Sequence, residues 1–477
     1  MELLKDPIII VLLVLLLITA YAALQPRRRP ELWLIILTIL LFGLPRAGLF
    51  IKQMNLPLPL NAILAAVFII EWLLLRQSRP MERSRVNYLF ILYTAISGVG
   101  LAIGLSTGGS YQIAFLELCF YLFAVGMYFY ASETFSEQRH FYLFARLVLA
   151  LSVLISLYGI GQRFLGDSLL VNYVTYNSAS ELARSYVQIE EAGLRRVLSS
   201  YGDPNVLASQ LVVFTGIALA LTVGKGISKN TRLLCLLVLL VNVLCTLYTG
   251  SRAGIICLFL ITMAVLIWRT RWALLLIPVF LGAGVLLAPF LQSLLEARFQ
   301  GLLTGEDIRR QFPAVAWQLV QTVPFGCGLG NSVELSFQGF HWSFAIKPAG
   351  VIWSGLNSFW LNLFSRLGIP GVITFGVLLW SLVRYISVRL KTIADPQVRA
   401  FLFGGLAGFG GQWLIWLVNN TYMLPGGNLN FWFMMGMLVA GARAFSVQPQ
   451  MVLVPLPEPV SGPRWMPALN QTIKNTV

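Results

Sequence analysis

The chain has 477 residues, of which 57% are hydrophobic and 11% are charged, and its mean hydropathy is +0.77. Soluble globular proteins usually have about 25% charged residues, so the composition excludes that class and predicts a polytopic membrane protein. Five cysteines exclude a disulfide-rich scaffold, and the meaning of the net charge of +15 depends on where the basic residues lie.

Apolar segments long enough to cross about 30 Å of hydrocarbon recur along the chain. They predict an all-α bundle of about 13 transmembrane helices, or 12 if Pro45, Pro57 and Pro59 keep one of the early segments from crossing. The expected spans are 7–24, 32–50, 58–75, 88–104, 112–130, 141–160, 205–224, 233–250, 253–268, 272–291, 369–386, 400–418 and 428–445. Gly250 is expected to join two of them into a tight helical hairpin.

Two connections are much longer than the others, which is uncommon unless such a loop is functional or disordered. The expected divisions are N-terminal helices at 1–160, a first long outer loop at 161–204, central helices at 205–291, a second long outer loop at 292–368, C-terminal helices at 369–445 and a disordered cytoplasmic tail at 446–477. Both loops keep enough apolar residues to form short amphipathic helices on a membrane surface. The tail is rich in proline and cannot hold a helix.

Basic residues gather in alternate connections, which is the positive-inside pattern of membrane proteins. They are Arg27, Arg28, Arg29, Arg76, Arg79, Arg83, Arg85, Lys225, Lys229, Arg232, Arg269, Arg271, Arg384, Arg389, Lys391 and Arg399. This pattern places both long loops outside and most of the basic surplus in the cytoplasm. The net charge therefore indicates topology and contact with the anionic lipid bilayer, and nucleic acid is not needed to explain it.

Few other side chains in the sequence could carry chemistry. The two histidines and the dispersed cysteines lack the spacing of metal ligands, so no metal and no other cofactor is expected. Glu71 and Glu117 lie within expected spans and are interpreted as snorkelling or locally paired side chains in preference to an ion path. The glycines of Pro324–Asn331 could cradle a phosphate, but no expected strand precedes them, and they predict a turn.

Arginines on the expected outer side form the most distinctive chemical pattern. Arg252 lies at the outer end of the hairpin, Arg195 and Arg196 stand at the foot of the first long loop, and Arg309 and Arg310 lie in the second. Guanidinium groups pair bidentately with phosphate oxygens, so converging arginines predict a pyrophosphate clamp. For any single arginine, a simpler interpretation is pairing with a nearby carboxylate such as Asp203, Glu306 or Asp307, or with a lipid headgroup.

Three segments together resemble the bacterial O-antigen ligase and O-antigen polymerase family of integral membrane glycosyltransferases. They are Gly250–Gly254 in the hairpin, Arg310 followed by Trp317 and Pro324–Asn331, and Asn357–Gly371 at the entry to a span. The stretch Asp203–Asn205 is similar to the entry of the family's middle region. The resemblance covers about residues 195–385.

The resemblance implies a metal-independent, GT-C-like transferase of the bacterial inner membrane. Such proteins move a glycan from undecaprenyl pyrophosphate to a glycan or lipid acceptor on the periplasmic face, in the synthesis of O-antigen, lipopolysaccharide or exopolysaccharide. Arg252 and Arg310 are then expected to hold the leaving pyrophosphate. The expected substrate-binding residues are Arg195, Arg196, Asn205, Arg309 and Asn357.

The chain departs from the family pattern at one position. A family histidine precedes the asparagine that matches Asn357, whereas this chain has Leu356, a difference that favours polymerase over ligase activity. His341 becomes the expected catalytic base if the loop folds back onto the site, and the alternative is a histidine at the membrane interface. Two other functions stay open, namely an anion or solute transporter and an inactive scaffold that assists other polysaccharide assembly proteins.

Overall fold

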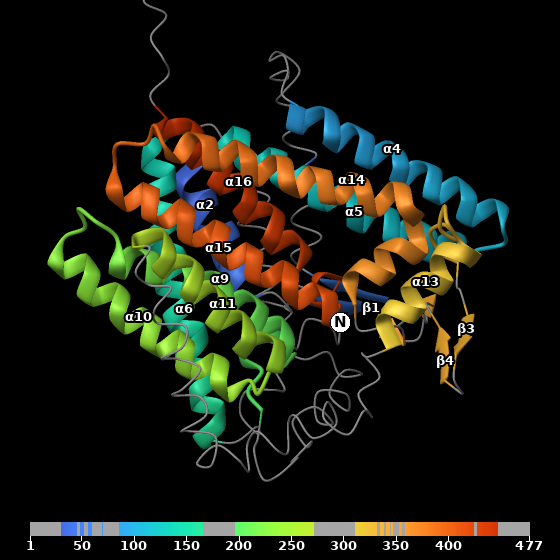
Figure 1. Ribbon diagram of the computed structural model, residues 1–477, viewed down its shortest axis with the longest axis horizontal. Coiled ribbons are helices and arrows are strands. Elements are labelled where there is room, and N and C mark those ends of the chain that lie inside the picture. The colour runs from blue at the N-terminus through green and yellow to red at the C-terminus, as the bar shows by residue number, and fades with distance from the viewer. Residues whose placement is uncertain are drawn as a thin grey trace, which may run out of the picture. The chain divides into compact units, whose positions relative to one another are not determined.

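A computed structural model of the protein shows a bundle of long α-helices with a few short strand pairs (Figure 1). It describes residues 30–44, 48–51, 56–59, 69, 85–165, 196–270, 311–331, 334–337, 340–343, 345–346, 353–354, 358–423 and 427–446. The expected spans at 7–24 and 272–291, almost all of the span at 58–75, and the tail after Ser446 lie outside these residues.

Eight described helices are long and apolar enough to cross a membrane. They are α4 (Arg85–Ser106), α5 (Tyr111–Thr134), α6 (Gln138–Leu165), α9 (Pro204–Val223), α10 (Lys229–Tyr248), α11 (Arg252–Arg269), α14 (Phe359–Leu390) and α15 (Pro396–Val418). Each coincides with an expected span; α14 begins at Phe359, but its backbone is broken at Gly368 (φ 62°), and its second part begins at the predicted start of 369. The helical membrane class is therefore confirmed, while the number of about 13 spans stays a prediction.

The segment at 32–50 differs from the single helix that the sequence predicts. α2 (Pro30–Thr38) continues as the π-helix η3 (Ile39–Gly43), and β1 (Gly48–Ile51) then pairs antiparallel with β2 (Leu56–Pro59). The apolar helix thus ends at Gly43 and is shorter than the roughly 20 residues that a span needs. Prolines in β2 cannot extend a helix, because proline lacks the backbone N–H group.

The second long loop contains short elements of its own. α13 (Phe312–Thr322) buries Phe312, Val315 and Leu319 on one face, whereas Trp317 on the other face is 63% exposed. β3 (Glu334–Phe337) pairs antiparallel with β4 (Phe340–Ser343), and β5 (Ala345–Ile346) pairs with β6 (Trp353–Ser354). The sequence did not predict these strand pairs, because two to four residues are too few to show a period.

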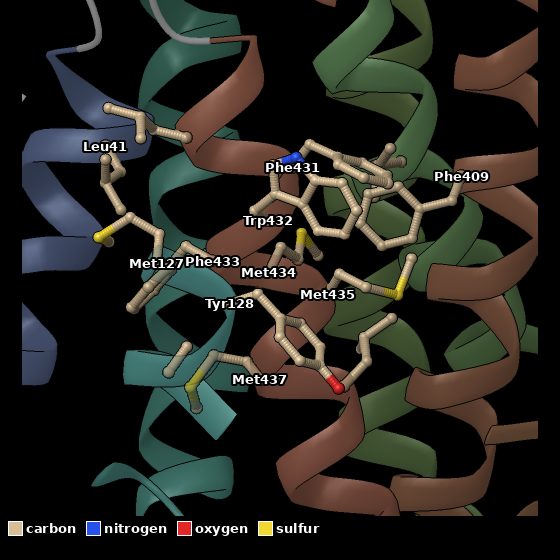
Figure 2. Close-up of a cluster of buried hydrophobic side chains, with 14 of the residues drawn as sticks. Leu41, Met127, Tyr128, Phe409, Phe431, Trp432, Phe433, Met434, Met435 and Met437 are labelled. Atoms are coloured by element: carbon tan, nitrogen blue, oxygen red, sulfur yellow. The ribbon is translucent and has the colours of Figure 1, made fainter. Parts of the chain in front are cut away.

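α16 (Asn428–Phe445) forms the middle of the bundle. Every residue from Asn428 to Ala442 is buried, and the helix packs against η3, α5, α6, α14 and α15 (Figure 2). Phe431 packs edge-on against Phe409 with ring centroids 5.0 Å apart, and Trp432 packs against Phe90 at 5.2 Å. A helix that is apolar on all sides must be surrounded by other helices, which explains this central position.

α9 and α15 approach each other through glycines. Gly216 on α9 faces Gly404 and Gly408 on α15, and a Cβ atom added at Gly408 would lie 2.5 Å from the Cα atom of Val213. Small residues four positions apart allow helix backbones in a membrane to come into direct van der Waals contact. α9 is consequently the most buried of the eight membrane-spanning helices that the structure describes.

The basic helix ends collect at one end of the bundle. Arg269 at the end of α11 donates to the Val223 carbonyl at the end of α9, at 2.7 Å, and Arg85 of α4 lines a pocket with Arg384 of α14. Contacts also join the α5–α6, α9–α10 and α14–α15 connections and the end of α16. This grouping agrees with the alternation of basic connections, and the assignment of this end to the cytoplasm stays a prediction.

Replacing Gly408 by alanine tests the close approach of α9 and α15. Gly408→Ala should lower the free energy of unfolding by about 1–3 kcal/mol, because the new methyl group would overlap the α9 backbone. Gly410 on the same helix has nothing within 4 Å of an added Cβ atom. Gly410→Ala is therefore the matched control and should be neutral or stabilising, since alanine favours a helix by about 1 kcal/mol over glycine. Thermal unfolding of the purified protein in detergent measures both, and equal melting temperatures would contradict the packing.

Candidate functional site

The hairpin turn between α10 and α11 is built by local polar contacts. Gly250 has a φ angle of 60°, a left-handed conformation that glycine adopts without strain. The Ser251 side chain caps α11 by accepting a hydrogen bond from the Gly254 backbone N–H group, at 3.3 Å. Arg252 is the first residue of α11, so the tight hairpin that the sequence predicts is confirmed.

The start of α9 is fixed by Asp203. Its Oδ1 atom accepts hydrogen bonds from the backbone N–H groups of Asn205, at 2.7 Å, and Val206, at 3.0 Å. Pro204 occupies the first helical turn, where its missing N–H group has no cost. Asp203 was an expected partner for an outer arginine, but in the structure this oxygen caps the helix.

Arg196 joins the first long loop to both of these helix starts. Its Nε atom donates to the Thr249 carbonyl at 2.8 Å, and its Nη2 atom donates to Asn205 Oδ1 at 3.3 Å. The neighbouring Val197 N–H group donates to the Tyr248 carbonyl at 3.2 Å. Arg196 and Asn205 are therefore brought together with the end of the hairpin that carries Arg252.

The N-termini of α9 and α11 lie side by side at this point. A Cβ atom added at Gly254 would be 2.8 Å from the Cβ atom of Ala208. In the first turn of α9, the N–H groups of Asn205 and Val206 are already bonded to Asp203, and in α11 the Gly254 N–H group is bonded to Ser251, so the caps take up these donors. Two helix starts and the arginines Arg196 and Arg252 therefore lie at this end of the bundle.

The glycine-rich segment Pro324–Asn331 forms the turn that the sequence predicts. Gly326, Gly328 and Gly330 have φ angles of 82°, 84° and 74°, and this geometry lets the turn lie against α4 and α14. The Cys327 N–H group donates to the Ser365 carbonyl at 2.8 Å, and the Leu329 N–H group donates to a carbonyl of α4 at 2.9 Å. These backbone groups are used in packing, so the turn does not cradle a phosphate with them.

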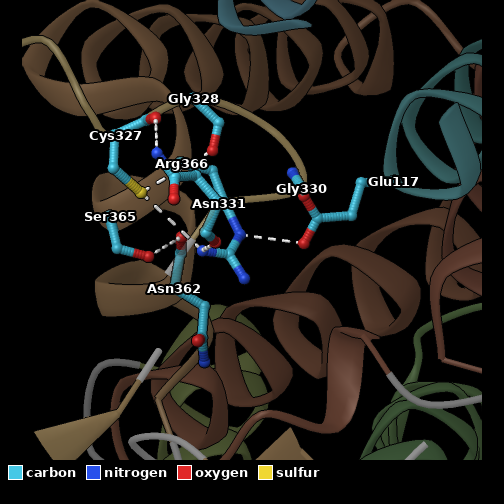
Figure 3. A network of polar contacts seen from close by, with 8 residues as sticks. All are labelled: Glu117, Cys327, Gly328, Gly330, Asn331, Asn362, Ser365 and Arg366. Atoms are coloured by element: carbon cyan, nitrogen blue, oxygen red, sulfur yellow. Dashed lines mark hydrogen bonds and ion pairs between the residues drawn. The ribbon is translucent and has the colours of Figure 1, made fainter. Parts of the chain in front are cut away.

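A buried ion pair holds this turn in place (Figure 3). Arg366 Nε on α14 donates to Glu117 Oε1 on α5 at 2.8 Å, and the two side chains are only 5% and 2% exposed. Glu117 Oε2 accepts from the Gly330 N–H group at 2.7 Å, and Arg366 Nη1 donates to the Asn331 carbonyl at 2.6 Å. The expectation that Glu117 snorkels or pairs locally is corrected, because its partner lies 249 residues later.

Arg366 lies within the segment Asn357–Gly371, but the sequence did not assign it a role of its own. A single charge inside the apolar run from Phe359 to Gly371 was a usable signal, since a charge in a span needs a partner. The pair anchors the turn that follows α13, and α13 begins two residues after Arg310. Glu117 and Arg366 therefore act as positioning residues for the second long loop.

Cys327 lies between the turn and the guanidinium group of Arg366. Its Sγ atom is 3.8 Å from Arg366 Nη1, and the residue is buried. Burial raises the pKa of the Cys327 thiol above its ordinary value, and the positive charge of Arg366 offsets part of that rise. The thiol therefore stays protonated near neutral pH. Its rate of reaction with a thiol reagent measures whether the turn is packed against the helices.

Most of the remaining predicted site residues lie outside the part of the chain that the structure describes. Arg195, Arg309, Arg310, Asn357 and the span residue Glu71 lie outside the described residues. His341 lies in β4, where its backbone pairs in register with Ser336 of β3. Among the residues that the structure describes, no group of three or more histidine, cysteine, aspartate or glutamate side chains could hold a metal ion.

Comparison of the sequence with protein-family models gave no match, and comparison with curated proteins gave none either.

Breaking the buried pair tests its role in positioning the loop. Glu117→Ala leaves the Arg366 guanidinium group buried without a counter-charge, which should cost about 3–5 kcal/mol of stability. Maleimide labelling of Cys327, located by mass spectrometry, should become faster because the turn detaches. Combining Glu117→Gln with Arg366→Met should recover much of the stability, since neither charge is then buried alone.

The exposed pair of Glu137 and Arg139 supplies the matched control, with a distance of 2.6 Å between Arg139 Nε and Glu137 Oε2. Glu137→Ala should leave both the melting temperature and the Cys327 labelling unchanged, because water solvates the remaining charge. A Glu117→Ala protein as stable as the Glu137→Ala protein would show that the buried pair is not needed.

Proposed function

We propose that this protein is a metal-independent membrane glycosyltransferase that uses undecaprenyl-pyrophosphate-linked glycan as its donor. The acceptor is a second glycan unit or a lipid-linked core, and the reaction takes place on the outer face of the bacterial inner membrane. The observation that carries the proposal is the double hydrogen bond of Arg196 to Thr249 and Asn205, at the adjacent N-termini of α9 and α11. It supports an anion site built from the segments that carry the family resemblance.

The proposed reaction is the displacement of a sugar from pyrophosphate. An acceptor hydroxyl oxygen forms a bond to the anomeric carbon, and the bond between that carbon and the pyrophosphate oxygen breaks. The electron pair leaves with undecaprenyl pyrophosphate, so negative charge develops on the leaving oxygen. Fixed cations in a water-poor region stabilise that charge without rearranging, which lowers the barrier.

The proposed roles follow from this charge development. Arg252 and Arg310 bind the leaving pyrophosphate bidentately, which a guanidinium group can do and an ammonium group cannot. Arg196 and Asn205 hold the hairpin that carries Arg252, and Arg195, Arg309 and Asn357 bind the remainder of the substrates.

A base must accept the proton of the acceptor hydroxyl. We assign this role to His341, because imidazole is the side chain that most often accepts a proton in catalysis near neutral pH. Leu356 occupies the position of the family histidine, and this favours polymerisation of repeat units over transfer to a lipid core.

Substitution of Arg252 by lysine tests the clamp. Arg252→Lys keeps the charge but loses the paired hydrogen bonds, and it should reduce turnover by about 10²–10³, the loss expected for one oxyanion donor. Arg399→Lys, at the opposite end of the bundle, is the matched control and should retain full turnover. The measurement is polymer formation by the purified protein from undecaprenyl-pyrophosphate-linked glycan. Normal turnover in Arg252→Lys would contradict the clamp, and polymer synthesis in cells that is indifferent to Arg252 would indicate a scaffold.

Removal of the proposed base should change the pH dependence of the reaction as well as its rate. His341→Ala should lower turnover at least about tenfold and abolish the acid limb of the pH profile, since protonated imidazole cannot accept a proton. A histidine that lies at the membrane interface would affect neither. Persistence of the acid limb in His341→Ala would transfer the role to an outer carboxylate, with Asp203 and Glu334 as the first to be substituted.

A further inference from the structure

A pocket between α4 and α14 lies at the basic end of the bundle, opposite the candidate functional site. Its volume is about 340 Å³, and three of its lining residues are the arginines Arg85, Arg384 and Arg389. α4 and α14 run side by side along this edge of the bundle (Figure 1). The pocket therefore opens where two membrane-spanning helices leave the hydrocarbon.

The three guanidinium groups have no carboxylate partner within the described part of the chain. The ion pairs found there involve Arg139, His140 and Arg366, and none reaches this pocket. Arg389 lies over the Tyr385 ring, with its Cζ atom 3.5 Å from the ring centroid, which orients the guanidinium group and leaves its charge in place. Three permanent positive charges in one pocket repel each other, so an anion between them is stabilised.

The other side of the same pocket is apolar. Val377, Trp380 and Val388 on α14 are 38%, 66% and 58% exposed, although large apolar side chains of this kind are buried in most proteins. Val377 precedes Arg389 by twelve residues, which is about 18 Å along a helix. The pocket thus changes from cationic at the helix end to apolar toward the middle of α14. A matching ligand has an anionic group at one end and an apolar chain at the other.

We propose that this pocket binds the headgroup of an anionic phospholipid, with an acyl chain lying along Val377 and Trp380. The phosphate would lie among the three arginines, and the Ser381 hydroxyl, which also lines the pocket, can donate a hydrogen bond to it. Basic pockets between membrane helices have this chemistry on the face of the membrane that is rich in anionic lipid. A volume of about 340 Å³ fits a headgroup, while the chains lie outside along the exposed side chains.

This site is separate from the proposed transferase activity and has a structural consequence of its own. α14 carries Arg366 near one end and the pocket near the other. The backbone of α14 is broken at Gly368, between Arg366 and the pocket, so a bound lipid would fix the part of α14 that follows the break. A ligand that binds only the folded protein raises its melting temperature, so lipid binding is measurable as stabilisation without any assay of catalysis.

Native mass spectrometry and thermal unfolding of the full-length, delipidated protein in detergent test the proposal. Phosphatidylglycerol and phosphatidylcholine with the same acyl chains are added in parallel. Phosphatidylglycerol should bind at least about tenfold more tightly, because it carries a net negative charge, whereas the choline ammonium group of phosphatidylcholine is repelled by the three arginines. The combined variant Arg85→Gln, Arg384→Gln and Arg389→Gln should lose this preference.

A second triple variant controls for loss of charge. Lys225, Lys229 and Lys391 are exposed at the same end of the bundle and outside the pocket lining, so replacing them with glutamine removes the same charge and should keep the preference for phosphatidylglycerol. Ser381→Asp leaves all three arginines in place and supplies an internal anion, so it should also weaken phosphatidylglycerol binding. This variant keeps the test decisive if the arginine variant does not fold.

Three results would overturn the proposal. Equal losses in the arginine and lysine variants would show that only the general charge of this end attracts lipid. Equal binding of phosphatidylcholine would show that the phosphate site has no role in selection. Displacement of phosphatidylglycerol by inorganic phosphate or glycerol 3-phosphate would show that the pocket takes a free phosphate and not a lipid.

Discussion

A guanidinium group that is almost fully buried has to be neutralised inside the protein, and Glu117 does this for Arg366 at 2.8 Å. The two residues lie on α5 and α14, and the carboxylate that neutralises the arginine also accepts the Gly330 N–H group. One electrostatic requirement therefore joins two helices and a loop. The turn can approach α4 only where glycines leave room for it. The buried ion pair and the glycine contacts therefore hold the turn in the same position.

The region proposed to bind pyrophosphate depends on close packing of α9 against its neighbours. α9 is held against α15 by glycine contacts around Gly216 and Gly408, and it begins beside α11 because Gly254 faces Ala208. Small residues thus bring two helix starts together, and Arg196 binds across them. Stability and the proposed chemistry depend on the same packing. The polar groups of Asp203 and Ser251 cap the two helices, and Arg196 bonds to a backbone carbonyl.

The two ends of the bundle treat positive charge differently. At the candidate functional site, Arg196 is held by carbonyl and amide oxygens of the protein, which fix its position. At the opposite end, Arg85 and Arg384 line an open pocket with exposed apolar side chains and no carboxylate among its described lining residues. Oriented guanidinium groups suit a reaction that needs preorganised charge, whereas unneutralised groups suit a lipid whose headgroup supplies the anion.

The sequence by itself determined the features that depend on neighbouring residues. Apolar runs gave eight described spans, Gly250 gave the hairpin, and the glycines from Pro324 to Asn331 gave the turn, because hydropathy and backbone freedom are local properties. Only the tertiary structure decided which polar groups meet: Arg366 pairs with Glu117 across 249 residues, and Arg196 reaches Thr249 across 53. Those pairs depend on which faces of distant helices come into contact. Close glycine contacts and the buried ion pair determine those faces.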